Sequence, residues 1–424
     1  MRPRPRQPKA VPPLPLRRPA PGGRPRIANT LAVLLLAPHA ATAAADATVW
    51  RVGPDQALTT IAEAARLATD GDTVLIAPGT YRGDVAVWTQ KALTIRGLAP
   101  RPVLVADGKS AQGKAIWVIR DGDFHIDNIE FRGARVAHGN GAGIRFERGR
   151  LLLERCVFRD NQMGVLTGNW PQSELDVRDS WFADAAQDGI GLHHLLYVGR
   201  IGRFTIEGSR FERGFEGHLL KSRARRSELR YNWLVDGSGG RASYEADFPD
   251  GGEVVLVGNT IGQSADSPNR SVVAYGAENR LWPDNRLTLV HNTLASDGWQ
   301  PAWFVRTWPD KVPLDDAVTT RNNLVIGLGV FEAALPGDHQ GNHALPFRST
   351  DSPSDFALPA DSPLRGQADM AFADSGLVPT AEFRFPVGTA PLAGMIRWAP
   401  GAFQSVAPPR ASSGRVGPQA EGDE

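Results

Sequence analysis

Three side chains that can carry protons stand at the same place in short segments that resemble one another. Lys221 ends a segment that begins at residue 217, His193 ends one that begins at 189, and Tyr244 ends one that begins at 240. Lysine, histidine and tyrosine all serve enzymes as general acids or bases. If the segments are strands that lie side by side, these side chains form one column that faces a common substrate.

The same fifth position in other segments of this kind adds Glu147, Tyr275 and Arg306 to the column, and Arg223 and Arg225 follow Lys221 in the expected turn. Between residues 213 and 230 the chain holds six lysines and arginines and one histidine, against two glutamates. This cationic patch favours an anionic polymer as a partner. The simpler alternative is a solvated loop. Nucleic acid is disfavoured, because the patch lacks interleaved aromatic residues on which bases stack.

The segments have the pattern of strands in a stacked parallel sheet. Seven of them align without gaps, starting at residues 143, 164, 189, 217, 240, 271 and 302. Their second and fourth positions are mostly apolar, as expected when alternate side chains of a strand face an interior. In the Lys221 segment this pattern places His218 and Leu220 inward and Lys221 outward. Since parallel strands lie about 4.8 Å apart, five consecutive segments would make the outward column continuous.

A second strand pattern recurs at intervals of 23 to 33 residues, from Ile126–Phe131 to Thr319–Leu324. Such variable spacing indicates a solenoid whose loops differ in length. The fourth position of this pattern is asparagine in four consecutive copies, Asn232, Asn259, Asn292 and Asn322. Stacked asparagines can pass amide hydrogen bonds from turn to turn at a buried corner, so these residues are predicted to be structural.

The beginning and the end of the solenoid carry the most specific stretches. A helical pattern at 58–68 is followed by GDTVLIAPGTY at Gly71–Tyr81 and by LTIRG at Leu93–Gly97. This order resembles the opening of secreted right-handed parallel β-helix proteins of the pectate-lyase-like superfamily, and Asp355–Leu364 and Trp398–Phe403 are similar to their closing segments. The resemblance covers residues 48–404 and implies an all-β, right-handed parallel β-helix. The N-terminal helix would cap its first unpaired edge.

The domain organisation follows from this resemblance and from composition. The β-helix is expected at 46–345, irregular strands that pack on it at 346–404, and a disordered tail at 405–424. Residues 1–45 run from a basic region through the apolar stretch Ile27–Leu36 to small residues, which is the order of a secretory signal. We therefore expect a periplasmic or secreted protein with no transmembrane segment, since the apolar stretch is too short to span a bilayer. A disordered cytoplasmic tail is the alternative.

One stretch links the chain to an activity. Glu216–Ser222, followed by Asn232, is similar to the lysine-bearing rung of the β-helical alginate lyases and chondroitinase B. This resemblance implies a polysaccharide lyase in which Lys221 takes the C5 proton of a uronate and the C4 oxygen leaves by β-elimination. A lysine base needs a pKa lowered by burial or by neighbouring cations.

The next rung of that family holds arginine, histidine and glycine, where this chain holds Ser243–Asp247. Tyr244 and His193 are therefore expected as catalytic partners of Lys221. The substrate-binding residues are expected to be Arg306, Tyr275, Arg223, Arg225 and Glu147.

Composition limits the remaining possibilities. The chain has 424 residues, a net charge of +1 and one cysteine, Cys156, which suits a soluble protein with a large core. No cofactor is required by this reading, although the acidic loop with Glu245, Asp247, Asp250 and Glu253 offers oxygen ligands for Ca²⁺. We expect a monomer whose partner is an anionic polysaccharide. The alternative function is a non-catalytic β-helix that binds glycan or assists assembly in the envelope.

Overall fold

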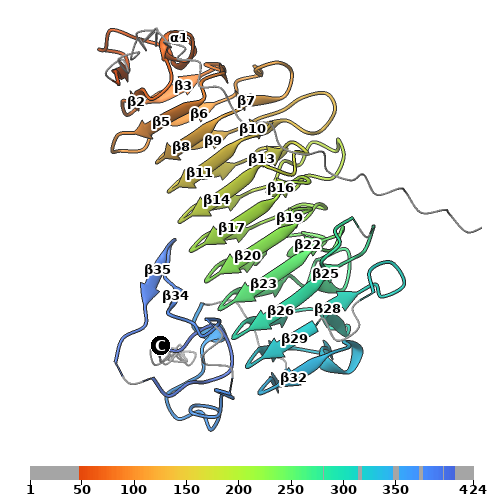
Figure 1. The fold of residues 1–424 in the computed structure, drawn as a ribbon. Coiled ribbons are helices and arrows are strands. Elements are labelled where there is room, and N and C mark those ends of the chain that lie inside the picture. The colour runs from red at the N-terminus through yellow and green to blue at the C-terminus, as the bar shows by residue number, and fades with distance from the viewer. Residues whose placement is uncertain are drawn as a thin grey trace, which may run out of the picture. The chain divides into compact units, whose positions relative to one another are not determined.

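The computed structural model describes residues 47–279, 281–313, 318–346, 353–371, 376–394 and 396–405. Its strands wind into a parallel solenoid with three sheets, of 12, 11 and 10 strands (Figure 1). The expected leader at 1–45 and most of the expected tail at 405–424 lie outside the described residues.

The 12-stranded sheet contains, in spatial order, β1 (Val49–Val52), β2 (Thr73–Ile76), β5 (Ala92–Gly97), β8 (Asp123–Asp127), β11 (Arg150–Glu154), β14 (Glu174–Arg178), β17 (Arg203–Glu207), β20 (Arg226–Arg230), β23 (Glu253–Val257), β26 (Arg286–Val290), β29 (Val318–Arg321) and β32 (Asp338–Gln340). The 11-stranded sheet contains β3 (Thr80–Arg82), β6 (Val103–Val105), β9 (Glu130–Arg132), β12 (Val157–Arg159), β15 (Trp181–Ala183), β18 (Arg210–Glu212), β21 (Trp233–Val235), β24 (Thr260–Gln263), β27 (Thr293–Ser296), β30 (Leu324–Ile326) and β33 (His343–Leu345). The 10-stranded sheet contains β4 (Ala86–Trp88), β7 (Ala115–Ile119), β10 (Ala142–Phe146), β13 (Met163–Thr167), β16 (Leu196–Val198), β19 (Leu220–Ser222), β22 (Ala246–Phe248), β25 (Ser271–Tyr275), β28 (Ala302–Thr307) and β31 (Gly329–Val330).

Each full turn takes one strand from the 12-stranded sheet, then one from the 11-stranded sheet, then one from the 10-stranded sheet. From β8 onward, the first two strands of a turn are joined by two residues. The first of the two has a positive φ in successive turns: Asn128, Arg155, Asp179, Gly208, Tyr231, Gly258, His291 and Asn322. The second pattern seen in the sequence is therefore two strands with a sharp corner between them.

The residue after that positive-φ position forms a hydrogen-bonded ladder inside the corner. The backbone N–H and Nδ2 of Asn232 donate to Oδ1 of Asn259 on the next rung, and those of Asn259 donate to Oδ1 of Asn292, at 2.9–3.0 Å. The prediction is confirmed for these three residues and wrong for Asn322. Asn323 continues the ladder, and Asn342 follows it. Asn322 has the positive φ and bonds outside the ladder instead.

Apolar side chains fill the space that the three sheets enclose. Phe131, Phe158, Phe182 and Phe211 stand on successive rungs of the 11-stranded sheet, and their rings stack with centroids 4.7–5.2 Å apart. All four are buried. Alternation within short strands thus produces a continuous core.

Non-solenoid segments lie at both ends of this core. The helix α1 (Ile61–Leu67) begins at Thr60, whose hydroxyl accepts from the Glu63 N–H, and Asp84 accepts from the Ile61 and Ala62 N–H groups. Its Ile61, Ala64 and Ala65 belong to the main core. Two short 3₁₀ helices, η1 (Glu332–Ala334) and η2 (Pro353–Phe356), and the antiparallel pair β34 (Ala381–Phe383) and β35 (Thr389–Pro391) complete the elements of the described chain.

The C-terminal residues pack on the outside of the 11-stranded sheet. Phe356 and Phe383 lie against Trp233, with the Phe356 and Trp233 ring centroids 4.9 Å apart. This contact covers outward apolar side chains of β21 and β30. The predicted all-β parallel solenoid is confirmed by the sheet order. Within the described ranges, no helix has the length and apolar character needed to cross a membrane.

Candidate active site

Five neighbouring strands of the 10-stranded sheet set the geometry around Lys221. In the register of β16, β19 and β22, Lys221 lies between Tyr197 and Asp247. The row continues through Ala274 on β25 to Arg306 on β28. Lys221 and Arg306 therefore share a column as predicted, separated by three strand spacings of about 4.8 Å each.

The prediction that His193 and Tyr244 stand beside Lys221 in this column is wrong. His193 and Tyr244 precede their strands and stand in the loops that lead into β16 and β22. The backbone of His193 bridges to Phe215 and Glu216, and it passes so close to Gly217 that a Cβ there would lie 2.0 Å from the His193 carbonyl oxygen. The loop lengths absorb the extra residues, which an alignment without gaps cannot represent.

Lys221 is an ion-paired, largely buried cation. Its Nζ lies 3.1 Å from Asp247 Oδ2 and 3.0 Å from Glu278 Oε1, and its side chain is 10% exposed. His218 Nε2 lies 3.3 Å from the same Asp247 oxygen. His218 thus contacts the charged cluster and does not enter the core, unlike Leu220, which is fully buried as predicted. The other Asp247 oxygen, Oδ1, is buried and has no hydrogen-bond partner among the described residues.

Arg223 stands beside Lys221 and is held from several directions. Its Nη1 lies 2.6 Å from Asp250 Oδ1, its Nε donates to the Tyr197 hydroxyl at 2.9 Å, and its Nη2 lies 2.5 Å from Glu278 Oε2. Asp250 is fully buried and also pairs with Arg200 at 3.0 Å. Arg223 is therefore fixed on the same face as Lys221, and both cations reach the carboxylate of Glu278.

The charges around Lys221 act against the lowered pKa that a lysine base requires. Burial lowers the pKa of Lys221, but the adjacent Asp247 and Glu278 carboxylates raise it more, so the net pKa lies above the ordinary value. Burial raises the pKa of Glu278, but Arg223 and Lys221 bring it below its usual range. In this arrangement Lys221 is protonated, and the lowered pKa expected of a lysine base is not present.

Aromatic and imidazole rings line the edge of the cluster. The His218 ring lies between those of His194 and Tyr244, with centroids 4.5 and 4.8 Å away. Burial and the neighbouring His218 and Lys221 charges hold the pKa of His194 well below its ordinary value, and its Nδ1 accepts from the His218 N–H. Tyr244 is half-buried, and burial followed by Asp247 raises its pKa, while Arg306 and Lys221 oppose this rise. Tyr244 and Arg306 therefore belong to the same electrostatic environment as Lys221.

The remaining predicted site residues lie elsewhere. His193 Nε2 pairs with Asp188 Oδ1 at 2.7 Å. Burial alone would raise the pKa of Asp188, but hydrogen bonds from His193, Gln162 and a backbone N–H lower it to about 2. Tyr275 does not face outward; it is fully buried, and its hydroxyl donates to the Gly252 carbonyl at 2.6 Å.

Arg225 and Glu147 form separate ion pairs. Arg225 Nη2 lies 2.6 Å from Asp284, and both side chains are more than half exposed. Glu147 pairs with Lys114 and Arg145 at the end of β10, three strands away from β19. Neither residue contacts the Lys221 cluster through a described ion pair.

The acidic loop after Tyr244 does not gather its carboxylates. Glu245 is buried beside Gln263, Asp247 pairs with Lys221, and Asp250 pairs with Arg200 and Arg223. Across the described parts of the chain, no group of three or more histidine, cysteine, aspartate or glutamate side chains is placed to hold a metal ion. Asp247 and Asp250, two of the four Ca²⁺ ligands suggested by the sequence spacing, are thus engaged in ion pairs.

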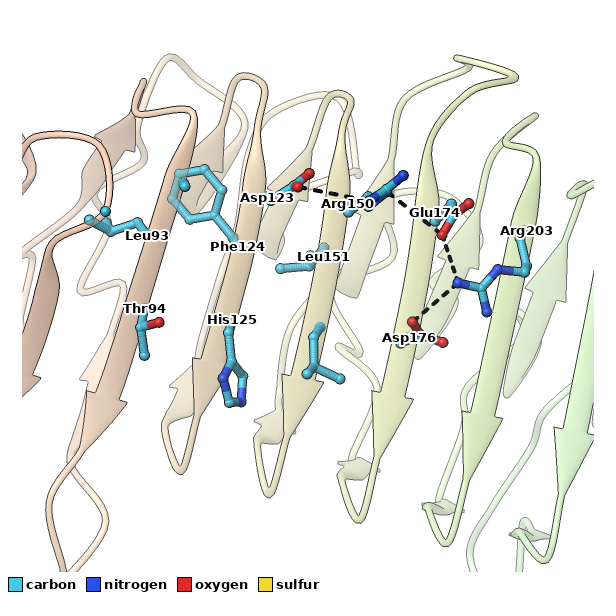
Figure 2. Close-up of a pocket in the computed structure, with 13 residues that line it drawn as sticks. Leu93, Thr94, Asp123, Phe124, His125, Arg150, Leu151, Glu174, Asp176 and Arg203 are labelled. Atoms are coloured by element: carbon cyan, nitrogen blue, oxygen red, sulfur yellow. Dashed lines mark hydrogen bonds and ion pairs between the residues drawn. The ribbon is translucent and has the colours of Figure 1, made fainter. Parts of the chain in front are cut away.

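A hollow of about 520 Å³ lies on a different face, outside the 12-stranded sheet, and is shown in Figure 2. Its charged side chains alternate in sign across the strands: Arg150 lies between Asp123 and Glu174, and Arg203 between Glu174 and Asp176 (Figure 2). Such cross-strand pairs stabilise the register of a sheet. Because these charges neutralise one another at the surface, we place the candidate site at the Lys221 cluster, where Asp247 Oδ1 and His218 Nδ1 are buried with no hydrogen-bond partner among the described residues.

Sequence reasoning missed three members of this cluster: Glu278, Tyr197 and His194. Glu278 reaches Lys221 from 57 residues further along the chain, from the loop after β25. No local spacing connects these positions, and only the strand register brings them together. Tyr197 could have been found by shifting the expected strand at 189–193 to the apolar alternation of 195–198.

The sheet order makes the fold a parallel β-solenoid. No protein-family model matches the sequence, and no curated protein does either. Among solved structures, the chain is similar to the pectate lyase Pel9A, with 13% identity, a TM-score of 0.43, and coverage of 84% of this chain and 96% of that one.

Two further solved structures are similar in the same way. A GH136 lacto-N-biosidase from Eubacterium ramulus has 12% identity and a TM-score of 0.44, with 71% of this chain and 68% of that chain covered. A PL6-family polysaccharide lyase from Pseudopedobacter saltans has 14% identity and a TM-score of 0.40, with 68% of this chain and 91% of that chain covered.

Proposed function

We propose that this protein is an exported polysaccharide lyase that cleaves an acidic, uronate-containing polysaccharide by β-elimination on the outer face of β16, β19 and β22. The observation that carries the proposal is the pair of largely buried cations, Lys221 and Arg223, that converge on the Glu278 carboxylate, with Tyr244 in the electrostatic environment of Lys221. Elimination next to a carboxylate requires the carboxylate charge to be neutralised, because the C5 carbanion then becomes accessible.

The roles follow from the geometry of the cluster. Arg223, fixed by Asp250 and Tyr197, binds the uronate carboxylate, and Arg306 binds a neighbouring one along the column. Lys221 removes the C5 proton, the C4–O4 bond breaks as the C4–C5 double bond forms, and the Tyr244 hydroxyl protonates the leaving O4. The raised pKa of Tyr244, caused mainly by burial, keeps this hydroxyl protonated.

The pH dependence of turnover tests the base assignment. The pKa of Lys221 is raised by Asp247 and Glu278 against the effect of burial, so the free amine forms only on the alkaline side. We expect kcat to rise about tenfold per pH unit from neutral pH upwards, until Lys221 or Tyr244 titrates. Steady-state kinetics across this range measure the slope. A turnover that is flat between pH 6 and 9 on a cleaved substrate would show that another group is the base.

The proposed reaction is tested by incubation of the mature protein with a panel of polyuronates. Ultraviolet absorbance of unsaturated products is expected with at least one of them, and Tyr244→Phe should reduce its rate. New reducing ends without that absorbance would instead indicate hydrolysis. N-terminal sequencing of protein recovered from the periplasm or medium tests export, with a start expected near Asp46.

A non-catalytic glycan-binding or envelope-assembly role is the second candidate, and the protonated, ion-paired state of Lys221 favours it. Binding of a polyuronate without any release of unsaturated product, across the whole pH range, would support this role over the lyase.

A further inference from the structure

The carboxylate of Glu278 occupies a position that is built for an anion. Its Oε1 lies 3.0 Å from Lys221 Nζ and its Oε2 lies 2.5 Å from Arg223 Nη2, so each oxygen has its own cation. The side chains of Lys221 and Arg223 are only 10% and 12% exposed, whereas that of Glu278 is 43% exposed. The cations thus belong to the wall of the site, and the carboxylate approaches them from the solvent side.

Both cations keep their positions without Glu278. Lys221 is held by Asp247, which is 2% exposed. Arg223 is held by the fully buried Asp250 and by the Tyr197 hydroxyl, and its backbone carbonyl accepts from the Trp282 indole N–H at 3.1 Å. Removal of the Glu278 carboxylate therefore leaves a preformed pair of donors and not a collapsed loop.

The cluster gains a net positive charge when the Glu278 carboxylate leaves. With Glu278 in place, the carboxylates of Asp247, Asp250 and Glu278 face the cations Lys221, Arg223 and Arg200. Without it, three cations face two carboxylates. All of these side chains except Arg200, which is 42% exposed, are at most 12% exposed, and charge interactions there are stronger than in water. An external anion is then favoured at the vacated position.

The backbone around Glu278 shows how it can leave at low cost. The Glu278 and Asn279 N–H groups both donate to the Pro249 carbonyl, at 2.9 and 3.1 Å, and Leu281 N–H donates to the Asp250 carbonyl. These bonds anchor the loop to the turn after β22 independently of the Glu278 side chain. Rotation of that side chain alone, about its own bonds, is enough to expose the two cations.

We propose that Glu278 is a resident substitute for the ligand carboxylate, and that a carboxylate-bearing sugar binds by exchanging with it between Lys221 and Arg223. The exchange rests on the proposed function for the class of ligand but not for the reaction. It makes carboxylate recognition competitive, so that a neutral sugar cannot displace Glu278 and an anionic one can. It also releases Lys221 from one of the two carboxylates that hold its proton.

Glu278→Gln is the direct test, with Asp284→Asn as the matched control. Asp284 stands in the same loop and pairs with the basic turn after β19, through Arg225, but does not reach Lys221 or Arg223. The two variants therefore remove the same charge from the same loop. Calorimetric titration with oligogalacturonate, oligoguluronate and oligomannuronate, and with neutral xylo-oligosaccharide, is compared across wild type and both variants.

We expect Glu278→Gln to bind at least one carboxylated probe about tenfold more tightly than wild type, which corresponds to about 1.4 kcal/mol. Asp284→Asn should change this affinity by less than about twofold, and the neutral probe should show no gain with either variant. A carboxylated probe that binds Glu278→Gln no more tightly than wild type, or gains as much from Asp284→Asn, overturns the exchange. Absence of binding to every variant overturns it as well.

A second measurement does not depend on the choice of sugar. Acetic anhydride labelling of Lys221, read by mass spectrometry, should be faster in Glu278→Gln than in wild type or Asp284→Asn, and added glucuronate should slow it. Equal labelling rates in all three proteins contradict the exchange. Because these readouts require no turnover, tighter carboxylate binding without unsaturated products would uphold the exchange and reject the lyase.

Discussion

Replacement of Lys221 by methionine is expected to lower lyase turnover by about 10²- to 10⁴-fold, the usual effect of losing a general base. Methionine keeps an unbranched side chain of similar length at a position that is 10% exposed, but it can neither take the C5 proton nor attract a carboxylate. The measurement is kcat on the polyuronate that gives unsaturated product. Loss of one charge contact alone would instead appear mainly in KM.

The same substitution leaves Asp247 buried without its lysine, so stability must be separated from catalysis. Asp247 is 2% exposed, and one of its oxygens already lacks a hydrogen-bond partner in the described chain. Removing one member of a buried pair costs about 3–5 kcal/mol. The double variant Lys221→Met with Asp247→Asn removes both charges and should regain most of this loss.

Turnover of the double variant decides the role of Lys221. If it is folded and still inactive, the missing amine accounts for the defect. If the single or the double variant retains the turnover of the wild type on a confirmed substrate, Lys221 is not the base, and its contacts with Asp247 and Glu278 are structural or ligand-binding.

The fold could be predicted because two local patterns determine it. Alternating apolar positions fix which side of each strand faces the core, and asparagine at the corner fixes where a strand ends and the next begins. Each pattern can be recognised within a few consecutive residues of the sequence. Asn232, Asn259 and Asn292 accordingly stack as the sequence indicates.

The composition of the candidate site could be predicted only in part, because it depends on loops that differ from turn to turn. Lys221 and Arg306 follow directly from strand alternation. Tyr197 and Asp247, and not His193 and Tyr244, flank Lys221, because the segments before β16 and β22 are loops and not strands. Glu278 comes from another turn of the solenoid, and it meets Lys221 and Arg223 only once the strands have stacked.

For His218 and Lys221, the charged neighbours decide the outcome, and strand alternation or burial alone predicts it wrongly. His218 stands at a position that alternates inward, yet it contacts Asp247 because the strand begins only at Leu220. Lys221 is buried as a lysine base should be, but the carboxylates beside it outweigh burial and raise its pKa. Which charges surround a buried group decides its protonation, and the sequence does not reveal those neighbours.

The asparagine ladder gives the largest expected effect on stability. The Asn259 side chain accepts at Oδ1 from the Asn232 N–H at 3.0 Å and donates at Nδ2 to the Leu229 carbonyl at 2.8 Å. Asn259 is fully buried, so Asn259→Ala leaves the N–H and one Nδ2–H of Asn232 without their acceptor and without water. Each such group costs about 1–3 kcal/mol, so unfolding should become easier by about 2–6 kcal/mol, measured by chemical denaturation.

Asn259→Ser is the matched control, because the chain itself places serine at this position in earlier turns. Ser209 Oγ accepts from the Ser180 N–H at 3.2 Å and donates to the Glu207 carbonyl at 3.1 Å, which reproduces part of the asparagine bonding. Asn259→Ser should therefore lose markedly less stability than Asn259→Ala. Because each turn of a solenoid contacts only its neighbours, the loss should be felt most by the turns of Asn232 and Asn292. Hydrogen exchange of the backbone amides at these two rungs shows where stability is lost. Equal stability of the alanine and serine variants would mean that corner packing, not the amide ladder, holds the turns together.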